Sequence, residues 1–431
     1  VTLVVINCYF NIMNNEIYVE EITAQSASAA RNLRTVNAEL RNQVLLTAAQ
    51  DLVVRTDEII AANAKDLALA PEYGLNDAMI DRLTLNPERI AAMAQSCREI
   101  AAFADPLGKE LETRTLPNGI ELSRTTVPIG SIFFIYESRP NVTIDGAALC
   151  FKAGNAVILR GGRESLHSST LLAEIFQNAI KSHDLDPFAV QLVTRTDREV
   201  VNLLLQRDDR LDLVIPRGGE GLIRAVVEQS RVPVIKHFKG VCHIYVDASA
   251  DVDITAPILR NAKIQRPGVC NAMETLLLDS QLSPETQKDL LKNLHSEGVE
   301  IYGCEATRKI FPDALPIAEN NFYHTEHLDL KLSVKIVNGI EQATEHIENY
   351  GSGHTEALIA QNEAVQNSFV SQVDASSVMV NASTRFADGG EYGLGAEVGI
   401  STDKLHARGP MGVDSLTTYK WILRGSGQIR S

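Results

Sequence analysis

Apolar residues recur at helical spacing over the first part of the chain. Between residues 17 and 70 they return every three or four positions, as at Leu40, Val44 and Ala48, which predicts amphipathic helices. Asn86-Pro87-Glu88 predicts the start of another helix, because Asn caps a first turn, Pro suits its first position and an acid complements the dipole. The N-terminal part of the chain is therefore expected to be helical.

Short apolar runs then alternate with amphipathic stretches. The expected strands are residues 129–136, 156–159, 190–193, 211–215, 232–235 and 243–246. The expected helices between them are residues 169–181, 198–205 and 222–228. Such alternation is typical of a parallel, doubly wound α/β sheet. A second series of apolar runs follows residue 248 and predicts a second α/β domain: 275–278, 299–302, 333–337, 357–360 and 378–380.

Two extended segments lie outside this alternation. Residues 120–127 follow several Pro and Gly residues and alternate in polarity, which predicts a hairpin or a protruding arm. Residues 416–424 form a last extended stretch after a Gly-rich segment. The predicted fold class is α/β with a small additional β element.

Composition narrows the function classes. The 431 residues exceed one ordinary domain, and 55 acidic against 40 basic residues give a formal net charge of -15. Such a surface disfavours nucleic acid and anionic membrane as partners. The apolar run at residues 1–6 is too short to span a membrane and lacks the basic flank of a signal peptide, so we interpret it as a start-site extension.

The six cysteines are dispersed, without CxxC and without tight Cys/His spacing. This pattern indicates neither a disulfide framework nor a metal site, and it favours the reducing cytoplasm. Their positions are Cys8, Cys97, Cys150, Cys242, Cys270 and Cys304.

Cys270 is the most informative of these residues. It ends a Pro-Gly turn, with Lys263 and Arg266 just before it and an apolar run just after it. Nearby cations lower the pKa of a thiol and so make it nucleophilic. A free Cys is also often simply packed in a core, so the local sequence leaves both interpretations open.

Two predicted strands end in paired glycines. The loops are Arg160-Gly161-Gly162-Arg163 and Pro216-Arg217-Gly218-Gly219, and each precedes a predicted helix. A Gly-rich turn at a helix start can bind a phosphate, and the arginines could bind a nucleotide 2′-phosphate. Neither loop is GxGxxG, and an ordinary tight turn would explain either one alone.

Three other loops carry polar side chains at predicted strand ends. Asn141 follows Arg139-Pro140 and could donate its amide to an oxyanion, or serve only in a turn. Lys236-His237 begins a basic loop that is either an anion site or a solvated turn. His354 lies in a Gly-rich loop, where a single histidine is more often structural.

Nine segments together carry a family resemblance that covers the chain from about residue 20 onward. They are residues 127–143, 153–162, 216–219, 232–237, 240–247, 261–270, 350–356, 380–386 and 406–412. In their order and content they resemble the γ-glutamyl phosphate reductases (glutamate-5-semialdehyde dehydrogenases), a branch of the aldehyde dehydrogenase superfamily.

The resemblance implies an aldehyde-dehydrogenase-like fold with three parts. A Rossmann-like NADP-binding domain would comprise residues 17–107 and 128–248, and an α/β catalytic domain residues 249–385. A small β oligomerisation arm would combine residues 108–127 and 410–431. Residues 386–409 would be a Gly-rich return segment. Residues 1–16 precede the resembling part of the chain, and we expect them to be a disordered extension.

The resemblance also implies a reaction. L-Glutamate 5-phosphate would be reduced by NADPH to glutamate 5-semialdehyde, with release of phosphate, in the second step of proline synthesis. Cys270 would be the nucleophile that forms a thioester, and Asn141 would stabilise the oxyanion. The two Gly-rich loops and Glu326 would bind NADP; Glu326 is the less secure match because His327 stands where the family has an aromatic residue.

The aldehyde-oxidising relatives carry a water-activating Glu in a Glu-Leu-Gly-Gly motif. The corresponding run here is His237-Phe238-Lys239-Gly240, which has no Glu, as suits an enzyme that must keep its thioester until hydride arrives. The cations within the matching segments are expected to bind the anionic substrate: Arg139, Lys236, His237, Arg266, Arg385, His406 and Arg408.

Further expectations follow from the resemblance. The protein should be a cytoplasmic homo-oligomer, a dimer or tetramer, that uses no metal. A complex with glutamate 5-kinase would protect a labile acyl phosphate, but no residue pattern here indicates one. Two alternatives remain: an oxidising or CoA-acylating aldehyde dehydrogenase, and an inactive scaffold in which Cys270 is unreactive.

Overall fold

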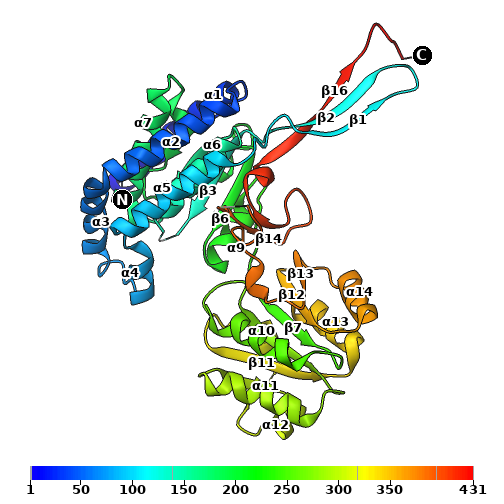
Figure 1. Cartoon of the computed structure of the whole chain (residues 1–431). Helices are drawn as coiled ribbons and strands as arrows, with labels where there is room; N and C mark the ends of the chain where they lie inside the picture. The colour runs from blue at the N-terminus through cyan, green and yellow to red at the C-terminus, as the bar shows by residue number, and fades with distance from the viewer. Residues whose placement is uncertain (1, 138, 318, 395, 431) are drawn as a thin grey trace. The chain divides into compact units, whose positions relative to one another are not determined.

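The computed structural model describes residues 2–137, 139–317, 319–394 and 396–430. These residues fold into two compact units (Figure 1). Unit 1 comprises Val1–Lys236, Leu394–Gly399 and Met411–Ser431, and unit 2 comprises His237–Gly393 and Ile400–Pro410. Within the described residues, no helix is long and apolar enough to cross a membrane.

Unit 1 contains a parallel four-stranded sheet in the order β5-β4-β3-β6. Its strands are β3 (Ser131–Tyr136), β4 (Ala156–Arg160), β5 (Val190–Leu192) and β6 (Leu213–Arg217). Every residue of β3 is buried, as expected for a strand in the middle of such a sheet. The predicted doubly wound α/β sheet is therefore confirmed for this unit.

The described residues of unit 1 form nine helices, some packed on this sheet and others on neighbouring helices. They are α1 (Thr2–Leu33), α2 (Ala38–Val54), α3 (Thr56–Leu69), α4 (Asp77–Leu83), α5 (Pro87–Ala102), α6 (Asn141–Lys152), α7 (Leu166–Ser182), α8 (Arg198–Leu205) and α9 (Glu220–Gln229). The predicted start of α5 is confirmed: the Asn86 side chain accepts a hydrogen bond from the Arg89 N–H at 2.8 Å.

The N-terminal extension was expected to be disordered through residue 16, and this expectation is wrong in the structure. Helix α1 runs without interruption from Thr2 to Leu33. Its Val19 and Ile22 are buried in a core cluster with residues of β3 and β6, such as Phe133 and Val214, so the helix is held by apolar packing. The side chains of residues 1–12 lie outside the described part of the structure.

Unit 1 also carries a three-stranded antiparallel sheet, the arm, in the order β1-β2-β16 (Figure 1). Its strands are β1 (Glu110–Thr115), β2 (Glu121–Pro128) and β16 (Thr417–Arg424). The C-terminal strand pairs along the whole of β2. The predicted union of the extended segment near residue 120 with the last strand is therefore present.

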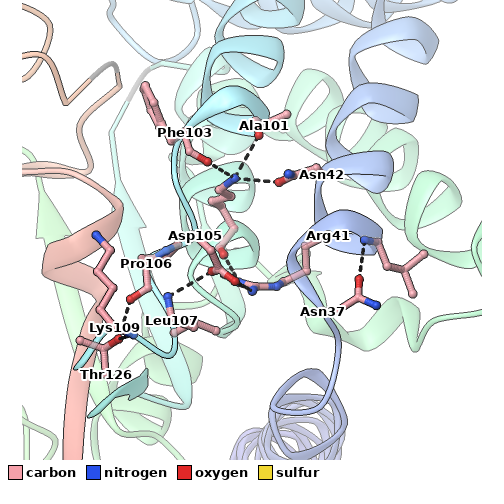
Figure 2. A network of polar contacts seen from close by, with 12 residues as sticks. Asn37, Arg41, Asn42, Ala101, Phe103, Asp105, Pro106, Leu107, Lys109 and Thr126 are labelled. Atoms are coloured by element: carbon pink, nitrogen blue, oxygen red, sulfur yellow. Dashed lines mark hydrogen bonds and ion pairs between the residues drawn. The ribbon is translucent and has the colours of Figure 1, made fainter. Parts of the chain in front are cut away.

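A buried polar network anchors the base of the arm (Figure 2). Arg41, only 1% exposed, pairs with Asp105 at 2.9 Å, and the Leu107 N–H donates to the same carboxylate. Thr126 of β2 donates to the Pro106 carbonyl at 2.7 Å. Lys152 donates to the Asn42 side chain and to the carbonyls of residues 101 and 103. These contacts connect the arm to α2, α5 and α6.

Unit 2 contains a parallel seven-stranded sheet in the order β10-β9-β11-β8-β7-β12-β13. Its strands are β7 (Cys242–Val246), β8 (Met273–Asp279), β9 (Glu300–Gly303), β10 (Leu315–Pro316), β11 (Lys331–Val337), β12 (Thr355–Ile359) and β13 (Ser377–Val380). Its helices are α10 (Val252–Ile264), α11 (Pro284–Ser296), α12 (Glu305–Ile310), α13 (Gly339–Tyr350) and α14 (Glu363–Gln372). Two short strands, β14 (Gly399–Ser401) and β15 (Gly409–Met411), pair with each other.

Two strands predicted for the first sheet differ in the structure. The strand expected at residues 232–235 is a single bridge between Val214 and Val234. The strand expected at residues 243–246 belongs to unit 2, because β7 pairs with β8 and β12. The boundary between the units therefore lies between Lys236 and His237 rather than after residue 248.

Candidate active site

Cys270 lies in the turn that leads from α10 to β8, at the centre of the sheet of unit 2. Its side chain is half-buried, whereas Cys97, Cys150 and Cys242 are buried. Burial raises the pKa of the Cys150 thiol to about 12 and also raises those of Cys97 and Cys242. Cys270 thus combines partial accessibility with a place at the amino end of a central strand.

The loop before β7 lies against the backbone of Cys270. A Cβ atom on Gly240 would overlap the Cys270 carbonyl group and Cα, so only glycine fits there. The Cys242 thiol donates to the Cys270 carbonyl oxygen at 3.2 Å. Gly240 ends the run His237–Gly240 and packs closely on the Cys270 backbone.

Arg385 is held beside Cys270 by two amide side chains of the same turn. Its Nε donates to the Gln265 side-chain oxygen at 3.0 Å, and its Nη1 donates to the Asn271 side-chain oxygen. Asn271 is buried and donates in turn to the Ala387 carbonyl at 3.0 Å. Burial, and then the charge of nearby Arg266, lower the pKa of Arg385, while the Cys270 charge opposes this effect.

The turn that carries Cys270 is closed by a buried ion pair. Lys263 at the end of α10 and Glu274 in β8 lie 3.0 Å apart, and both side chains have zero exposure. Burial raises the pKa of Glu274 to about 7 and lowers that of Lys263, each against the charge of its partner. Glu274 also accepts a hydrogen bond from the Leu328 N–H at 3.2 Å.

Glu326 contacts Gly240, in the loop before β7 that packs on Cys270. Its Oε1 accepts a hydrogen bond from the Gly240 N–H at 2.8 Å, so one carboxylate oxygen holds the loop that packs on Cys270. The next residue, His327, hydrogen-bonds to Ser333 at 3.1 Å through Nε2 and stacks on Tyr302. Glu326 was predicted only as a cofactor ligand, and this structural contact could not be read from the sequence.

His237 and His354 lie edge to face, with ring centroids 5.8 Å apart. His354 is completely buried, and its Nδ1 lies 2.9 Å from the Thr355 hydroxyl and 3.7 Å from the Cys242 sulfur. Burial, assisted by the charge of His237, lowers the pKa of His354 to about 3. His354 is therefore neutral near pH 7, and it contacts Cys242, whose thiol donates to the Cys270 carbonyl.

The C-terminal basic candidates differ from Arg385 in their contacts. Arg408 forms an ion pair with Asp374 at 2.7 Å, and Lys404 pairs with the same carboxylate. His406 has a positive φ of 71° in the return between β14 and β15. Arg408 and Lys404 thus share one exposed carboxylate, which offsets only part of their combined charge.

The predicted cofactor loops lie at the carboxyl ends of β4 and β6, the two strands that flank β3 in unit 1. Arg160 donates to the carbonyls of Gly161 and Thr196, while its buried Nε has no hydrogen-bond partner. Arg163 lies over the Tyr73 ring at 4.6 Å. An arginine with an unsatisfied buried N–H fits an anionic group such as a nucleotide phosphate.

The β6 loop has a different partner. The Gly219 N–H, at the start of α9, donates to a carboxylate oxygen of Glu137 at 3.0 Å. Arg217 donates to the Glu397 carbonyl at 3.2 Å. An acidic side chain thus occupies the position where a phosphate was expected on Gly218 and Gly219, and sequence reasoning had missed it.

Asn141 is the first residue of α6 in unit 1. Its Nδ2 donates to Asp145 at 3.0 Å, which fixes the amide and leaves its second N–H for another acceptor. Burial raises the pKa of Asp145, and Ser96 donates to that carboxyl group at 3.2 Å. Lys236 ends unit 1, and Arg139 lies next to Pro140, just before α6.

Comparison with known proteins decides the family. The model of the aldehyde dehydrogenase family matches residues 11–300. The chain belongs to this family. It is 48% identical over 412 residues to the γ-glutamyl phosphate reductase of a Nitratiruptor species, covering 96% of this chain and 100% of that protein. It is 49% identical over 418 residues to the same-named protein of Moorella thermoacetica, covering 97% and 100%.

Solved structures agree with this membership. The γ-glutamyl phosphate reductase of Thermotoga maritima is 40% identical, with a TM-score of 0.94, over 96% of this chain and 100% of that one. An acetylating aldehyde dehydrogenase from Geobacillus thermoglucosidasius has a TM-score of 0.69 at 16% identity, over 97% and 99%, which shows a shared fold. The resemblance drawn from the sequence and the aldehyde-dehydrogenase-like α/β fold are confirmed, and the chain is an oxidoreductase of this family.

Proposed function

We propose that the protein reduces L-glutamate 5-phosphate to L-glutamate 5-semialdehyde with NADPH, in proline biosynthesis in the cytoplasm. The observation that carries this proposal is the half-buried Cys270 with Arg385 held beside it by Gln265 and Asn271. A fixed cation next to a thiol favours the thiolate and attracts an anionic acyl phosphate. The relatives named γ-glutamyl phosphate reductase support the same substrate.

In the proposed reaction the Cys270 thiolate attacks the acyl carbon, and the bond from that carbon to the phosphate oxygen breaks. Phosphate leaves with the electron pair, and a thioester on Cys270 remains. NADPH, when bound, supplies the hydride that reduces this thioester. The resulting hemithioacetal releases the aldehyde and regenerates the thiolate. Asn141 is proposed to donate its amide N–H to the oxyanion in both steps.

The β4 loop is proposed to bind the phosphates of NADPH. Arg160 has an unsatisfied buried N–H, and Arg163 lies next to the paired glycines, so both fit the 2′-phosphate that distinguishes NADPH from NADH. The β6 loop, with Glu137 on its Gly219 N–H, fits a hydroxyl-bearing group better than a phosphate. Glu326, whose Oε1 accepts from the Gly240 N–H, is proposed to bind the ribose, as the family resemblance implies.

The predicted substrate-binding cations are assigned different roles. Arg266 and Arg385 are proposed to bind the acyl phosphate, because the charges of Arg266 and Cys270 both act on the Arg385 guanidinium, so the three groups lie near one another in unit 2. Arg139, Lys236 and His237 remain candidates for the amino acid end of the substrate. His406 is a weaker candidate, and so is Arg408, because it pairs with Asp374.

The arm is proposed to join copies of this chain into a homo-oligomer. Strand β16 is an edge of its three-stranded sheet, and an open edge can pair with another strand. Tyr419, Trp421 and Leu423 on this strand are 44–59% exposed. Association would cover both the strand edge and these apolar side chains.

The decisive assay runs the reaction in reverse. With glutamate 5-semialdehyde and NADP, we expect NADPH to form only when inorganic phosphate is present, and we expect Cys270→Ala to abolish it. Cys304→Ser, which removes the other half-buried thiol in the described residues, serves as the control and should remain active. Turnover that is indifferent to phosphate, or that requires coenzyme A, would contradict the acyl phosphate assignment.

A further inference from the structure

The backbone of Cys270 is enclosed by segments that are distant in sequence but joined by polar contacts. One side is closed by residues 240–242: Gly240 packs on the Cys270 backbone, and the Cys242 thiol donates to the Cys270 carbonyl at 3.2 Å. The Gly240 N–H is held in turn by Glu326 at 2.8 Å. The position of Gly240 therefore depends on the segment that carries Glu326.

That segment is held by the buried carboxylate of the Cys270 turn itself. Glu274 Oε1 accepts from the Leu328 N–H at 3.2 Å, while Glu274 Oε2 pairs with Lys263 at 3.0 Å. Leu328 has a positive φ of 53°, which a non-glycine residue adopts only when its surroundings enforce it. Glu274 therefore fixes a backbone conformation that would not form without support.

These contacts link Cys270 to Glu274, to the 326–328 segment and, through Gly240, back to the Cys270 backbone. Lys263 holds the other end of the same turn. We propose that Glu274, paired with Lys263, is a positioning residue that sets the place of Cys270 through the 326–328 segment.

The energetics of buried ion pairs support a positioning role over a purely stabilising one. Removing two charges from water costs more than their attraction returns in many proteins, and an apolar pair of similar size is often as stable or more stable. Both side chains here have zero exposure. An apolar pair could fill the same space, but it could not accept a hydrogen bond from the Leu328 N–H.

A set of three variants tests this proposal. The double variant Lys263→Met/Glu274→Met replaces the pair by apolar side chains and removes the acceptor. Glu274→Gln keeps an oxygen that can accept from Leu328 N–H. The matched control, Glu305→Met/Lys309→Met, removes an exposed ion pair of α12 in the same unit. Urea unfolding verifies that each variant is folded.

Two readouts are taken on each variant. The first readout is the kcat of the phosphate-dependent reaction, which rests on the proposed function. The second is the rate at which iodoacetamide alkylates Cys270, measured on the Cys270 peptide by mass spectrometry. This rate does not depend on the proposed function. For the folded double variant we expect kcat to fall about tenfold or more, as for a misplaced reacting group, with KM changed much less. We also expect its alkylation rate to differ about fivefold or more from the parent rate, because the enclosure of the thiol changes.

A folded Glu274→Gln variant should stay within about threefold of the parent in both readouts, because its one amide oxygen can still accept from the Leu328 N–H. The loss of the charge pair with Lys263 should lower the stability of this variant instead. The control should match the parent. A folded double variant with the parent alkylation rate would overturn the proposal, as would a folded Glu274→Gln variant as impaired as the double variant. If the double variant does not fold, Glu274→Leu is compared with Glu274→Gln: both leave Lys263 without its counter-ion, but only Gln keeps an acceptor for the Leu328 N–H, so equal readouts in the two folded variants would overturn the proposal. If the parent shows no phosphate-dependent reaction, the proposed function fails while the alkylation rates still decide the positioning role.

Discussion

Gly240 lies against the backbone of Cys270 so closely that any side chain at position 240 would overlap the Cys270 carbonyl group. Gly240→Ala must therefore displace the nucleophile or the loop before β7. We expect a loss of about tenfold or more in kcat, as for a reacting group displaced by a fraction of an ångström to an ångström. Steady-state kinetics of the reverse reaction measure this loss.

Gly221→Ala is the control for this substitution. Gly221 lies in helix α9, and a Cβ there would meet no atom within 4 Å. Alanine is favoured over glycine in helices, so this variant should be as stable as the parent or more stable, with unchanged activity. A Gly240→Ala variant with parental kcat would show that the close packing has no catalytic consequence.

Arg385 provides the second prediction. Its guanidinium is oriented by neutral amide oxygens on Gln265 and Asn271 rather than by a carboxylate, so its charge remains available to an anion. Arg385→Gln should lower kcat/KM for phosphate in the reverse direction by about 10- to 100-fold, the value of one charge-assisted hydrogen bond. The KM for NADP should change little.

Arg408→Gln is the informative comparison for Arg385. Arg408 is already paired with Asp374 at 2.7 Å, so we expect a smaller effect on kcat/KM for phosphate than at Arg385. An Arg408 variant that loses more than the Arg385 variant would reverse the assignment of the phosphate-binding cation.

Arg163 carries the prediction on cofactor choice. It lies in the β4 loop with its guanidinium over the Tyr73 ring at 4.6 Å. If it binds the 2′-phosphate, Arg163→Ala should reduce the preference for NADP over NAD by about tenfold or more, the loss of one charge-assisted contact. Arg195→Ala removes the same kind of contact, over Tyr18 at 4.7 Å, and should leave the preference unchanged.

Some features of the fold could be predicted from the sequence and others could not, for physical reasons. The strand after Cys270 and the helix after Asn86 were predictable because apolar runs and capping residues act locally. The membership of β7 in the second sheet was not, because β7 lies about midway between β6 and β8 in the chain, and its other neighbour, β12, is distant in sequence. A strand carries no local mark of the sheet that it joins.

The polar contacts of the candidate site could also be predicted from the sequence only in part. Cys270 and Arg385 stood out because their residue types carry chemistry. The pairing of Glu326 with the Gly240 N–H, the carboxylate of Glu137 on Gly219, and the ion pair of Arg408 depend on three-dimensional proximity. An acid near a base in sequence does not specify its partner, because only the fold determines which groups are desolvated together.

The base of the arm supports a prediction on stability. Arg41 is 1% exposed, and its carboxylate partner is Asp105 (Figure 2). Burial lowers the pKa of neighbouring Lys152 to about 8, with a further contribution from the Arg41 charge, so a second cation lies close by. Asp105→Asn leaves Arg41 buried without its counter-ion, and we expect the free energy of unfolding to fall by about 3 kcal/mol in urea titrations.

Glu121→Gln is the matched control at the other end of the arm. Glu121 pairs with Arg424, and both side chains are more than half exposed. Exposed pairs contribute little, so this variant should lose less than about 1 kcal/mol. Equal losses in the two variants would show that the network at the base does not anchor the arm.

His354 supports a prediction on acid stability. Burial lowers the pKa of this completely buried imidazole to about 3, whereas the unfolded value is 6.5. Below pH 6.5 the unfolded chain takes up a proton at this residue that the folded protein does not accept. The stability that His354 contributes is therefore fully present above pH 6.5 and is lost as the pH falls toward 3.

His354→Asn keeps a polar group near the Thr355 hydroxyl and removes the titration. Its absolute stability should fall, because the smaller side chain leaves a cavity. The difference in unfolding free energy between pH 7.5 and pH 5.0 should shrink by about 2 kcal/mol, from about 1.4 kcal/mol for each pH unit below 6.5. His324→Asn, at an exposed histidine of the same unit, is the matched control for the substitution itself. An unchanged pH dependence in His354→Asn would mean that the folded protein accepts a proton at the buried His354 imidazole. The surroundings of His354 would then tolerate a positive charge.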